Sequence, residues 1–249
     1  MRKVLVGLFL VFLVGSAIGD ECPVTTWSYK DQAAWKGECQ SGNRQSPVNI
    51  GSPTTRAPHK LVLDYGEVTF DVKNTSRMSK ALFSGQSNGG VVVDGVRYYL
   101  DDIHFHTPAE HRVGSTQNVM EMHVVNKRPA GDAVVIAVLF TLGTSSPALH
   151  AIINATPEKE CDHKVAGKFA LIPALIPWQK EGSNTWLTYD GSLTTPGCDP
   201  VVRFFILRKT IEVSSADRDR LMKLFGDTAR DQQPAQPVFE ETQPAATKN

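Results

Sequence analysis

Three histidines in this chain have the type and spacing that bind a metal ion. The segment DDIHFHTPAEH, residues 101–111, places His104 and His106 two positions apart. Alternate side chains of a strand point to the same face, so both imidazoles would project from one rigid element. His123 in EMHVVN belongs to a second predicted strand, and antiparallel pairing of the two strands would bring it close to the first pair. Three imidazoles without a thiolate favour Zn²⁺, with copper, nickel or cobalt as alternatives, and leave a fourth tetrahedral position for water.

Two carboxylates strengthen this metal hypothesis. Asp102 comes two residues before His104, and Glu121 comes two residues before His123, so each lies on the same side of its strand as the histidine. A carboxylate at that place accepts the proton of the ring nitrogen that does not bind metal, and thereby fixes the tautomer. The alternative, that these histidines are packing or surface residues, becomes less attractive with a third histidine and two matched carboxylates.

Glu110 leaves a second kind of metal site open. HFHTPAE also fits H-x-H-x-x-x-E, the first metal motif of the cupins, in which the glutamate is itself a ligand and the metal is iron or manganese. The second cupin motif requires Pro-x-Gly shortly before the later histidine, and GSTQNVMEMH contains none. A cupin-like metalloenzyme remains the alternative from another class.

The elements that must position these residues are mostly strands. Short β-branched or aromatic segments separated by Gly, Asn, Pro or Ser predict strands at 61–65, 67–72, 89–95, 97–106 and 118–125. The apolar runs 133–140 and 202–213 predict central, buried strands. Helical patterns are few, at 145–156 and 214–226. Gln, Pro and Ala after Phe225 predict that the last dozen residues form an extended or disordered tail.

The composition and the N-terminus limit the class of protein. Acidic and basic side chains balance at 26 each, which favours neither nucleic acid nor an anionic membrane as a partner. A basic start, the apolar run 4–14 and small residues before Asp20 predict a secretory signal peptide over 1–19, with an uncleaved anchor as the alternative. No later segment reaches the ~20 apolar residues of a membrane span. We therefore expect a secreted or periplasmic protein with no membrane span after cleavage.

Four segments together resemble the α-class carbonic anhydrases, particularly their secreted bacterial-type members. They are RQSPVNI (44–50), HFHTPAEH (104–111), MEMHVVN (120–126) and YDGSLTTPGC (189–198). The resemblance runs in consistent order from Trp27 to about Pro237. It implies a single domain over 20–237, mainly β with short helices (α+β) and a large, twisted, mostly antiparallel central sheet. A polar tail, 238–249, would follow it.

The resemblance implies a zinc enzyme that reversibly hydrates carbon dioxide to bicarbonate and a proton by a zinc-hydroxide mechanism. His104, His106 and His123 would be the zinc ligands. The hydroxyl of Thr194 would accept a hydrogen bond from the zinc-bound hydroxide and donate its own proton to Glu110. A hydroxyl that donates to a carboxylate has only lone pairs left for the solvent molecule, so this pair selects and orients hydroxide.

The family also implies where the substrate and inhibitors bind. Thr195 and the backbone N–H of Thr194 would lie beside the substrate. A small apolar pocket suits carbon dioxide, which has no net dipole. Its wall would be Val125, Val135, Leu193, Val202 and Phe204. Sulfonamides or inhibitory anions would bind at the zinc, and the family allows a homodimer.

Three positions depart from the family pattern. Faster members carry a proton-shuttle histidine in an N-N-G-H run, and the matching stretch here, NTSR, places Arg77 there. A guanidinium does not release its proton at working pH, so we predict modest, buffer-sensitive turnover, with His59 as an alternative shuttle. Asp102 replaces the usual glutamine, and its charge should raise the pKa of the zinc-bound water. Phe204 replaces the usual tryptophan.

The four cysteines, in a chain expected to be exported, favour two disulfides over free thiols. Family members with this layout imply a Cys39–Cys198 bridge that fastens the loop of Thr194, and leave Cys22–Cys161 as the second bridge. Some relatives have lost zinc ligands and act as binding proteins, and others act as storage proteins. A non-catalytic member of the family is therefore the remaining alternative function.

Overall fold

One large twisted sheet is the main element of the fold. The computed structural model describes residues 26–83, 89–171 and 184–243. In spatial order, the main path of the sheet is β12 (His163–Ala170), β4 (Glu67–Asn74), β5 (Ser79–Leu82), β7 (Val96–His106), β10 (Met120–Lys127), β11 (Ala133–Leu142), β14 (Val202–Val213), β13 (Asn184–Gly191), β15 (Phe239–Gln243) and β2 (Thr54–Thr55). Most neighbouring strands are antiparallel, as predicted, although β11 with β14 and β15 with β2 are parallel.

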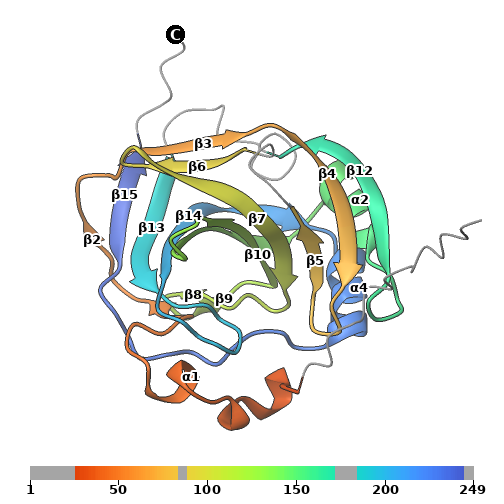
Figure 1. The fold of residues 1–249 in the computed structure, drawn as a ribbon, viewed down its shortest axis with the longest axis horizontal. Coiled ribbons are helices and arrows are strands. Elements are labelled where there is room, and N and C mark those ends of the chain that lie inside the picture. The colour runs from red at the N-terminus through yellow and green to blue at the C-terminus, as the bar shows by residue number, and fades with distance from the viewer. Residues whose placement is uncertain (1–25, 84–88, 172–183, 244–249) are drawn as a thin grey trace, which may run out of the picture.

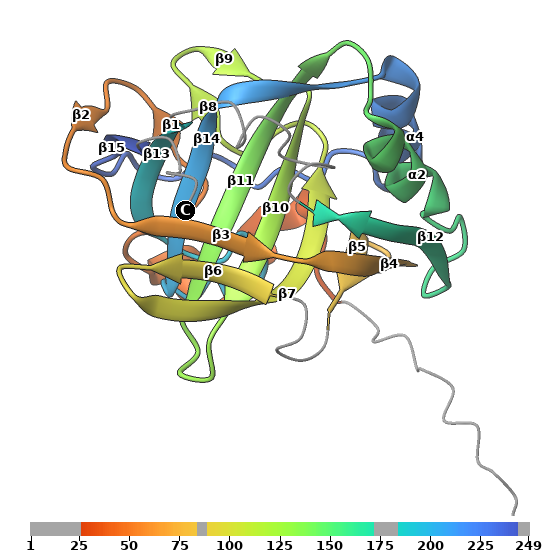
Figure 2. The same cartoon turned by 90° about the horizontal axis from the view of Figure 1, so that it is seen from above.

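Smaller elements complete the fold. β3 (Leu61–Tyr65) and β6 (Gly89–Val93) extend the sheet beyond β7. A separate small sheet contains β1 (Asn49–Ile50), β8 (Arg112–Val113) and β9 (Thr116–Gln117). Within the part of the chain that the structure describes, the helices are the 3₁₀-helix η1 (Tyr29–Ala34), α1 (Glu38–Ser41), α2 (Pro147–Ala155) and α4 (Ser215–Phe225). Figures 1 and 2 show α2 and α4 together beside β12, at one end of the sheet. The prediction of a mainly β protein with few helices is confirmed.

The central strand β11 shows why its sequence is apolar throughout. Its even-numbered side chains from 134 to 140 pack in one core with residues of α2 and α4. Its odd-numbered side chains from 133 to 139 pack in a second core with Tyr189 and Phe204. Because a strand presents alternate residues to opposite faces, a strand covered on both faces has no position for a polar residue.

The two longer helices begin where the sequence predicts. Ser146 caps α2 by accepting a hydrogen bond from the N–H of Leu149, and Ser214 caps α4 by accepting one from the N–H of Asp217. Gly226 ends α4 with a positive φ of 72°. Glycine reaches that conformation without the steric penalty that other residues meet.

The predicted C-terminal tail differs from the structure at its start. Residues 238–249 were expected to lie outside the domain, but Phe239–Gln243 form β15 and pair with β13 and β2. FEETQ has little β propensity, so its sequence gives no strand pattern. The strand is held instead by tertiary contacts, because the fully buried Glu241 accepts a hydrogen bond from Nε of Arg56 at 2.6 Å.

Two predictions about the N-terminus fall outside this description. The signal peptide over 1–19 and Cys22 both lie outside the described residues. Within the described ranges, no helix is both long and apolar enough to cross a membrane.

Candidate metal centre

Antiparallel pairing of β7 with β10 brings the three predicted histidines together. His123 lies directly opposite His104 in the register of the two strands. Ring centroids are 5.0 Å apart for His104 and His106, 5.2 Å for His104 and His123, and 4.8 Å for His106 and His123. One nitrogen from each ring lies within 4.8 Å of the others, and all three residues are buried. Two adjacent strands therefore supply a compact, rigid set of nitrogen donors.

Each ring uses its other nitrogen for a hydrogen bond to a protein oxygen. Nδ1 of His104 lies 2.6 Å from Oδ1 of Asp102, and Nε2 of His123 lies 2.8 Å from Oε1 of Glu121. Nδ1 of His106 lies 2.8 Å from the carbonyl oxygen of Thr228. Carbonyl and ionised carboxylate oxygens only accept hydrogen bonds, so these nitrogens carry the protons.

The remaining nitrogens fit a bound cation. They are Nε2 of His104, Nε2 of His106 and Nδ1 of His123, and their lone pairs are free to bind a metal. Nε2 of His106 is buried, and among the described residues it has no hydrogen-bond partner. A buried polar atom without a partner is unfavourable, and a metal ligand bond would remove that penalty. Three neutral imidazoles suit zinc and leave one tetrahedral position open.

The pKa values of these histidines differ in direction. Burial lowers the pKa of His104 to about 4 and that of His106 to about 3. Burial also acts to lower the pKa of His123, but the charge and hydrogen bond of Glu121 more than offset it and raise that pKa above its usual value. His104 and His106 are therefore neutral at pH 7, which is the form that binds metals.

Glu110 lies close to the triad and is fully buried. Its Oε1 accepts a hydrogen bond of 3.0 Å from the N–H of Arg230, and its Oε2 lies 3.4 Å from Nε2 of His106. It is not part of the group of converging ligand atoms. The pKa of Glu110 is raised above its usual value, because burial and the charge of Glu121 outweigh the charge of His123, the N–H of Arg230 and the Thr194 side chain, which act to lower it. The Thr194 side chain therefore acts on this carboxyl group in favour of its ionised form.

A cavity of about 310 Å³ opens beside the triad. Its wall has an apolar side and a polar side, formed by different residues. The predicted wall residues all line it: Val125, Val135, Leu193, Thr194, Thr195, Val202 and Phe204. On the polar side its wall contains Arg77, Lys80, Asp102 and Lys127. The structure therefore brings the predicted residues to one cavity, while their contact with a substrate stays a prediction.

The two residues considered for proton transfer lie apart. Arg77 lines the cavity, and its Nε donates a 2.8 Å hydrogen bond to the carbonyl oxygen of Trp27. His59 does not line the cavity. Its Nδ1 lies 2.8 Å from Oε1 of the buried Glu241 on β15. The structure therefore does not favour His59 as a shuttle.

A buried polar network behind the triad was not predicted. Nδ1 of His111 lies 2.7 Å from Oε1 of Glu121, and its Nε2 lies 2.6 Å from the hydroxyl of Tyr189. That hydroxyl is also 2.9 Å from Oγ of Ser46. His111 and Tyr189 lie within the segments 104–111 and 189–198, so their position in these motifs was the available clue.

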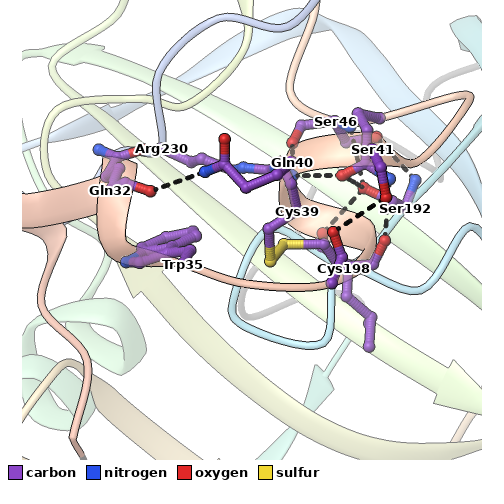
Figure 3. Close-up of a disulfide and its surroundings, with 12 residues drawn as sticks. Gln32, Trp35, Cys39, Gln40, Ser41, Ser46, Ser192, Cys198 and Arg230 are labelled. Carbon is purple, nitrogen blue, oxygen red and sulfur yellow. Dashed lines mark hydrogen bonds between the residues drawn. A yellow bond between two sulfur atoms is a disulfide. The ribbon is translucent and has the colours of Figure 1, made fainter.

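The loop that contains Thr194 is fixed by a disulfide. Cys39 and Cys198 are bonded, as predicted, with their Cα atoms 4.9 Å apart (Figure 3). Beside this bond, Arg230 donates hydrogen bonds of 3.1 Å to the carbonyl oxygen of Cys39 and 2.7 Å to that of Ser46. The backbone N–H of Arg230 also donates to Glu110. Arg230 therefore connects the disulfide-bonded N-terminal segment to the buried carboxyl group. The Cys22–Cys161 pairing stays a prediction.

Three comparisons place this geometry among known proteins. The family model described as eukaryotic-type carbonic anhydrase matches residues 26–249. A carbonic anhydrase of Klebsiella pneumoniae is 30% identical over 208 residues, which cover 78% of this chain and 82% of that protein. A hyperthermostable carbonic anhydrase identified from an active hydrothermal vent chimney superposes with a TM-score of 0.76 at 29% identity, covering 86% of this chain and 99% of that one. The α-carbonic anhydrase of Thermovibrio ammonificans, solved with the inhibitor sulfanilamide, gives a TM-score of 0.68 at 29% identity, covering 82% and 89%.

Proposed function

Since this chain belongs to the eukaryotic-type carbonic anhydrase family, we propose that it catalyses the reversible hydration of carbon dioxide to bicarbonate and a proton. The observation that carries the proposal is the convergence of three histidine nitrogens beside a cavity with one apolar side. A neutral apolar substrate and a metal-dependent nucleophile can meet in such a site. The storage or binding alternative would leave this arrangement without a use.

Zn²⁺ is the proposed metal, held by Nε2 of His104, Nε2 of His106 and Nδ1 of His123. When bound, zinc supplies an ionised solvent molecule at neutral pH, because it lowers the pKa of its water to about 7, the value established for carbonic anhydrases. The hydrogen bonds of Asp102, Glu121 and Thr228 hold the rings in the tautomers that this binding requires.

Thr194 and Glu110 are proposed to orient the nucleophile. The Thr194 side chain acts on the carboxyl group of Glu110 and lowers its pKa, which favours the ionised form. If the hydroxyl is the donor to an ionised carboxylate, its oxygen can only accept from a solvent molecule in the cavity, and this aligns the solvent lone pair with the substrate. The N–H of Arg230 acts to lower the pKa of Glu110, but burial outweighs it and leaves that pKa raised.

The apolar side of the cavity is the proposed carbon dioxide pocket. Val125 and Val202 contribute aliphatic surface, and the ring of Phe204 lies parallel to that of Tyr189 with centroids 5.1 Å apart. This stacking holds the Phe204 ring in place. Thr195 lies in the same wall, where it can contact the substrate or the bicarbonate product.

Arg77 is proposed to limit turnover. Its guanidinium lies at the cavity but keeps its proton at working pH, so it relays none. Direct transfer to hydroxide or solvent then limits turnover to on the order of 10^3 per second. We expect kcat to rise with buffer concentration, and Arg77→His to raise kcat in dilute buffer several-fold. A wild-type rate near 10^6 per second in dilute buffer would contradict this.

One experiment tests the function as a whole. Elemental analysis of the purified protein should find about one zinc per chain, and stopped-flow assays should show carbon dioxide hydration that a sulfonamide inhibits. The double variant His104→Ala/His106→Ala should lose both zinc and activity. Zinc without hydration would favour the binding or storage alternative, and iron or manganese would favour the cupin-like one.

The proposed localisation is tested separately. Expression with export should yield a mature protein that begins at Asp20 and is secreted or periplasmic. An N-terminal sequence that starts at Met1 would overturn the signal-peptide prediction. Peptide mapping without reduction of the same sample would establish the Cys22–Cys161 bridge.

A further inference from the structure

We propose that Lys80 is a positioning residue of the metal centre, acting through Asp102 on His104. This inference rests on the proposed zinc site. Nζ of Lys80 lies 2.9 Å from Oδ2 of Asp102, and Oδ1 of the same carboxylate lies 2.6 Å from Nδ1 of His104. Lys80, Asp102 and His104 therefore form a chain of two successive polar contacts that ends at a metal-facing ring.

The backbone explains why this line forms. β5 and β7 are antiparallel, and Lys80 is the direct partner of His104 in their register. Side chains of directly opposed residues lie on the same face of a sheet, so Lys80 and His104 flank the Asp102 carboxylate. Lys80 also lines the cavity together with Asp102 and His104.

The carboxylate needs both of its partners. The side chain of Asp102 is only 3% exposed, whereas that of Lys80 is 27% exposed. A buried carboxylate with an unpaired oxygen is unfavourable, so loss of the ammonium would favour rotation of Asp102 toward solvent. Rotation would take Oδ1 away from His104 and free the ring to turn. Lys80 fixes the carboxylate and, through it, the ring.

The acceptors for the other two histidines are held by groups inside the protein. The acceptor for His106 is the carbonyl oxygen of Thr228, which the backbone fixes. The acceptor for His123 is Glu121, whose two oxygens are both hydrogen-bonded to His111. Lys80 has the equivalent role for His104, with the difference that its side chain is partly in solvent.

The test measures zinc dissociation constants by competition with a chromophoric chelator at one pH. Lys80→Met, which keeps the aliphatic stem, should weaken zinc binding about tenfold, the lower end of the range for residues that support metal ligands. Lys80→Arg keeps the charge and should remain within about twofold of wild type. In an Asp102→Asn background, Lys80→Met should have no further effect, because the residue through which it acts is altered.

Lys127 supplies a matched control. Its Nζ lies 2.8 Å from Oδ2 of Asp101, a 38% exposed carboxylate, and it lines the same cavity. Lys127→Met removes the same charge without touching the Asp102–His104 bond, so zinc affinity should change less than about twofold. Equal losses in Lys80→Met and Lys127→Met would mean a general charge effect and would overturn the inference.

The remaining outcomes are equally decisive. Unchanged or tighter binding in Lys80→Met overturns the role of Lys80 while leaving the zinc site intact. Failure of the wild-type protein to bind zinc overturns the proposed metal centre, and the inference with it. Thermal unfolding of the zinc-free variants shows whether each remains folded, so that a loss of affinity is not mistaken for a loss of structure.

Discussion

Asp102 and Glu121 occupy equivalent places in adjacent strands, two residues before a metal-facing histidine, but their surroundings differ. Glu121 is completely buried and contacts His111 and His123. Asp102 borders the cavity, and its second oxygen meets the partly exposed Lys80. The same sequence spacing thus produces one carboxylate that belongs to the protein interior and one that belongs to the cavity wall.

The difference shows what each carboxylate supports. Glu121 connects His123 through His111 to the hydroxyl of Tyr189, and from there to Ser46. Loss of Glu121 therefore affects the core as well as the ring that faces the metal. Asp102 connects His104 only to Lys80, which can be hydrated when its partner is lost. We expect Glu121 to matter for folding and metal binding, and Asp102 mainly for metal binding.

The largest loss of zinc affinity and of stability is expected for Glu121→Gln. The amide cannot accept all the hydrogen bonds that His111 and His123 now donate, and it removes a buried charge between them. Zinc affinity should fall about 10–100-fold, and the zinc-free protein should lose about 3–5 kcal/mol of unfolding free energy. Chelator competition and urea unfolding measure the two effects.

Glu67→Gln is the matched control for Glu121→Gln. Glu67 pairs with Lys168 at 3.2 Å, but the two side chains are 62% and 61% exposed. The same chemical change there should alter stability by less than about 0.5 kcal/mol. A stability loss in Glu121→Gln no larger than that of the control would show that the buried network does not support the fold.

The second prediction concerns pH, because burial outweighs Asp102 at His104 whereas Glu121 outweighs burial at His123, so the pKa values of the two histidines shift in opposite directions. The folded pKa of His104 is lowered to about 4 and that of His106 to about 3, whereas that of His123 is raised. Near pH 5 the unfolded chain binds nearly two more protons at His104 and His106, and His123 is protonated in both states. Stability of the zinc-free protein should therefore fall by roughly 2.5 kcal/mol per pH unit below pH 6.

Urea unfolding of the zinc-free protein at pH 7, 6 and 5 measures this slope. The double variant His104→Gln/His106→Gln lacks both depressed groups, so its profile should be nearly flat over the same window. Excess zinc should restore stability at pH 6 by binding the folded state. Equal slopes in the wild type and the double variant would refute the assignment of the two neutral histidines.

The features of the metal centre that depend on local spacing along a strand could be predicted from the sequence. His104, Asp102, His123 and Glu121 follow from alternation along two strands, and the sheet follows from the same periodicity. His111 could not be assigned, because its contact with Tyr189 spans 78 residues. Such contacts depend on how the sheet closes, and strand patterns do not encode that.

The same limit explains the other differences. The carbonyl oxygen that orients His106 comes from residue 228, 122 positions away. β15 was expected to be tail, because Gln, Pro and Ala are frequent after Phe225. Glu241 is nonetheless buried, since Arg56, His59 and Thr188 supply its hydrogen bonds. Its partners, and not its own pattern, make this segment a strand.

Of the two carboxylates beside the histidines, Asp102 is expected to show the smaller effect on stability when it is replaced, as Asp102→Asn. The amide oxygen still accepts from Nδ1 of His104, and the ammonium of Lys80 can turn to water. Unfolding free energy of the zinc-free protein should fall by only about 1–2 kcal/mol, while zinc affinity falls about tenfold. The comparison with Glu121→Gln is made at one pH on zinc-free samples.

The stability loss of Asp102→Asn relative to that of Glu121→Gln shows whether the two carboxylates have different roles in the zinc-free fold. Both variants weaken zinc binding, but only Glu121→Gln leaves buried donors without an acceptor, so it alone should lower stability by several kcal/mol. If Asp102→Asn destabilises the zinc-free protein as much as Glu121→Gln does, the cavity wall supports the fold as strongly as the interior. In that case Lys80 would be a structural partner of Asp102 and not a residue that positions His104 for the metal.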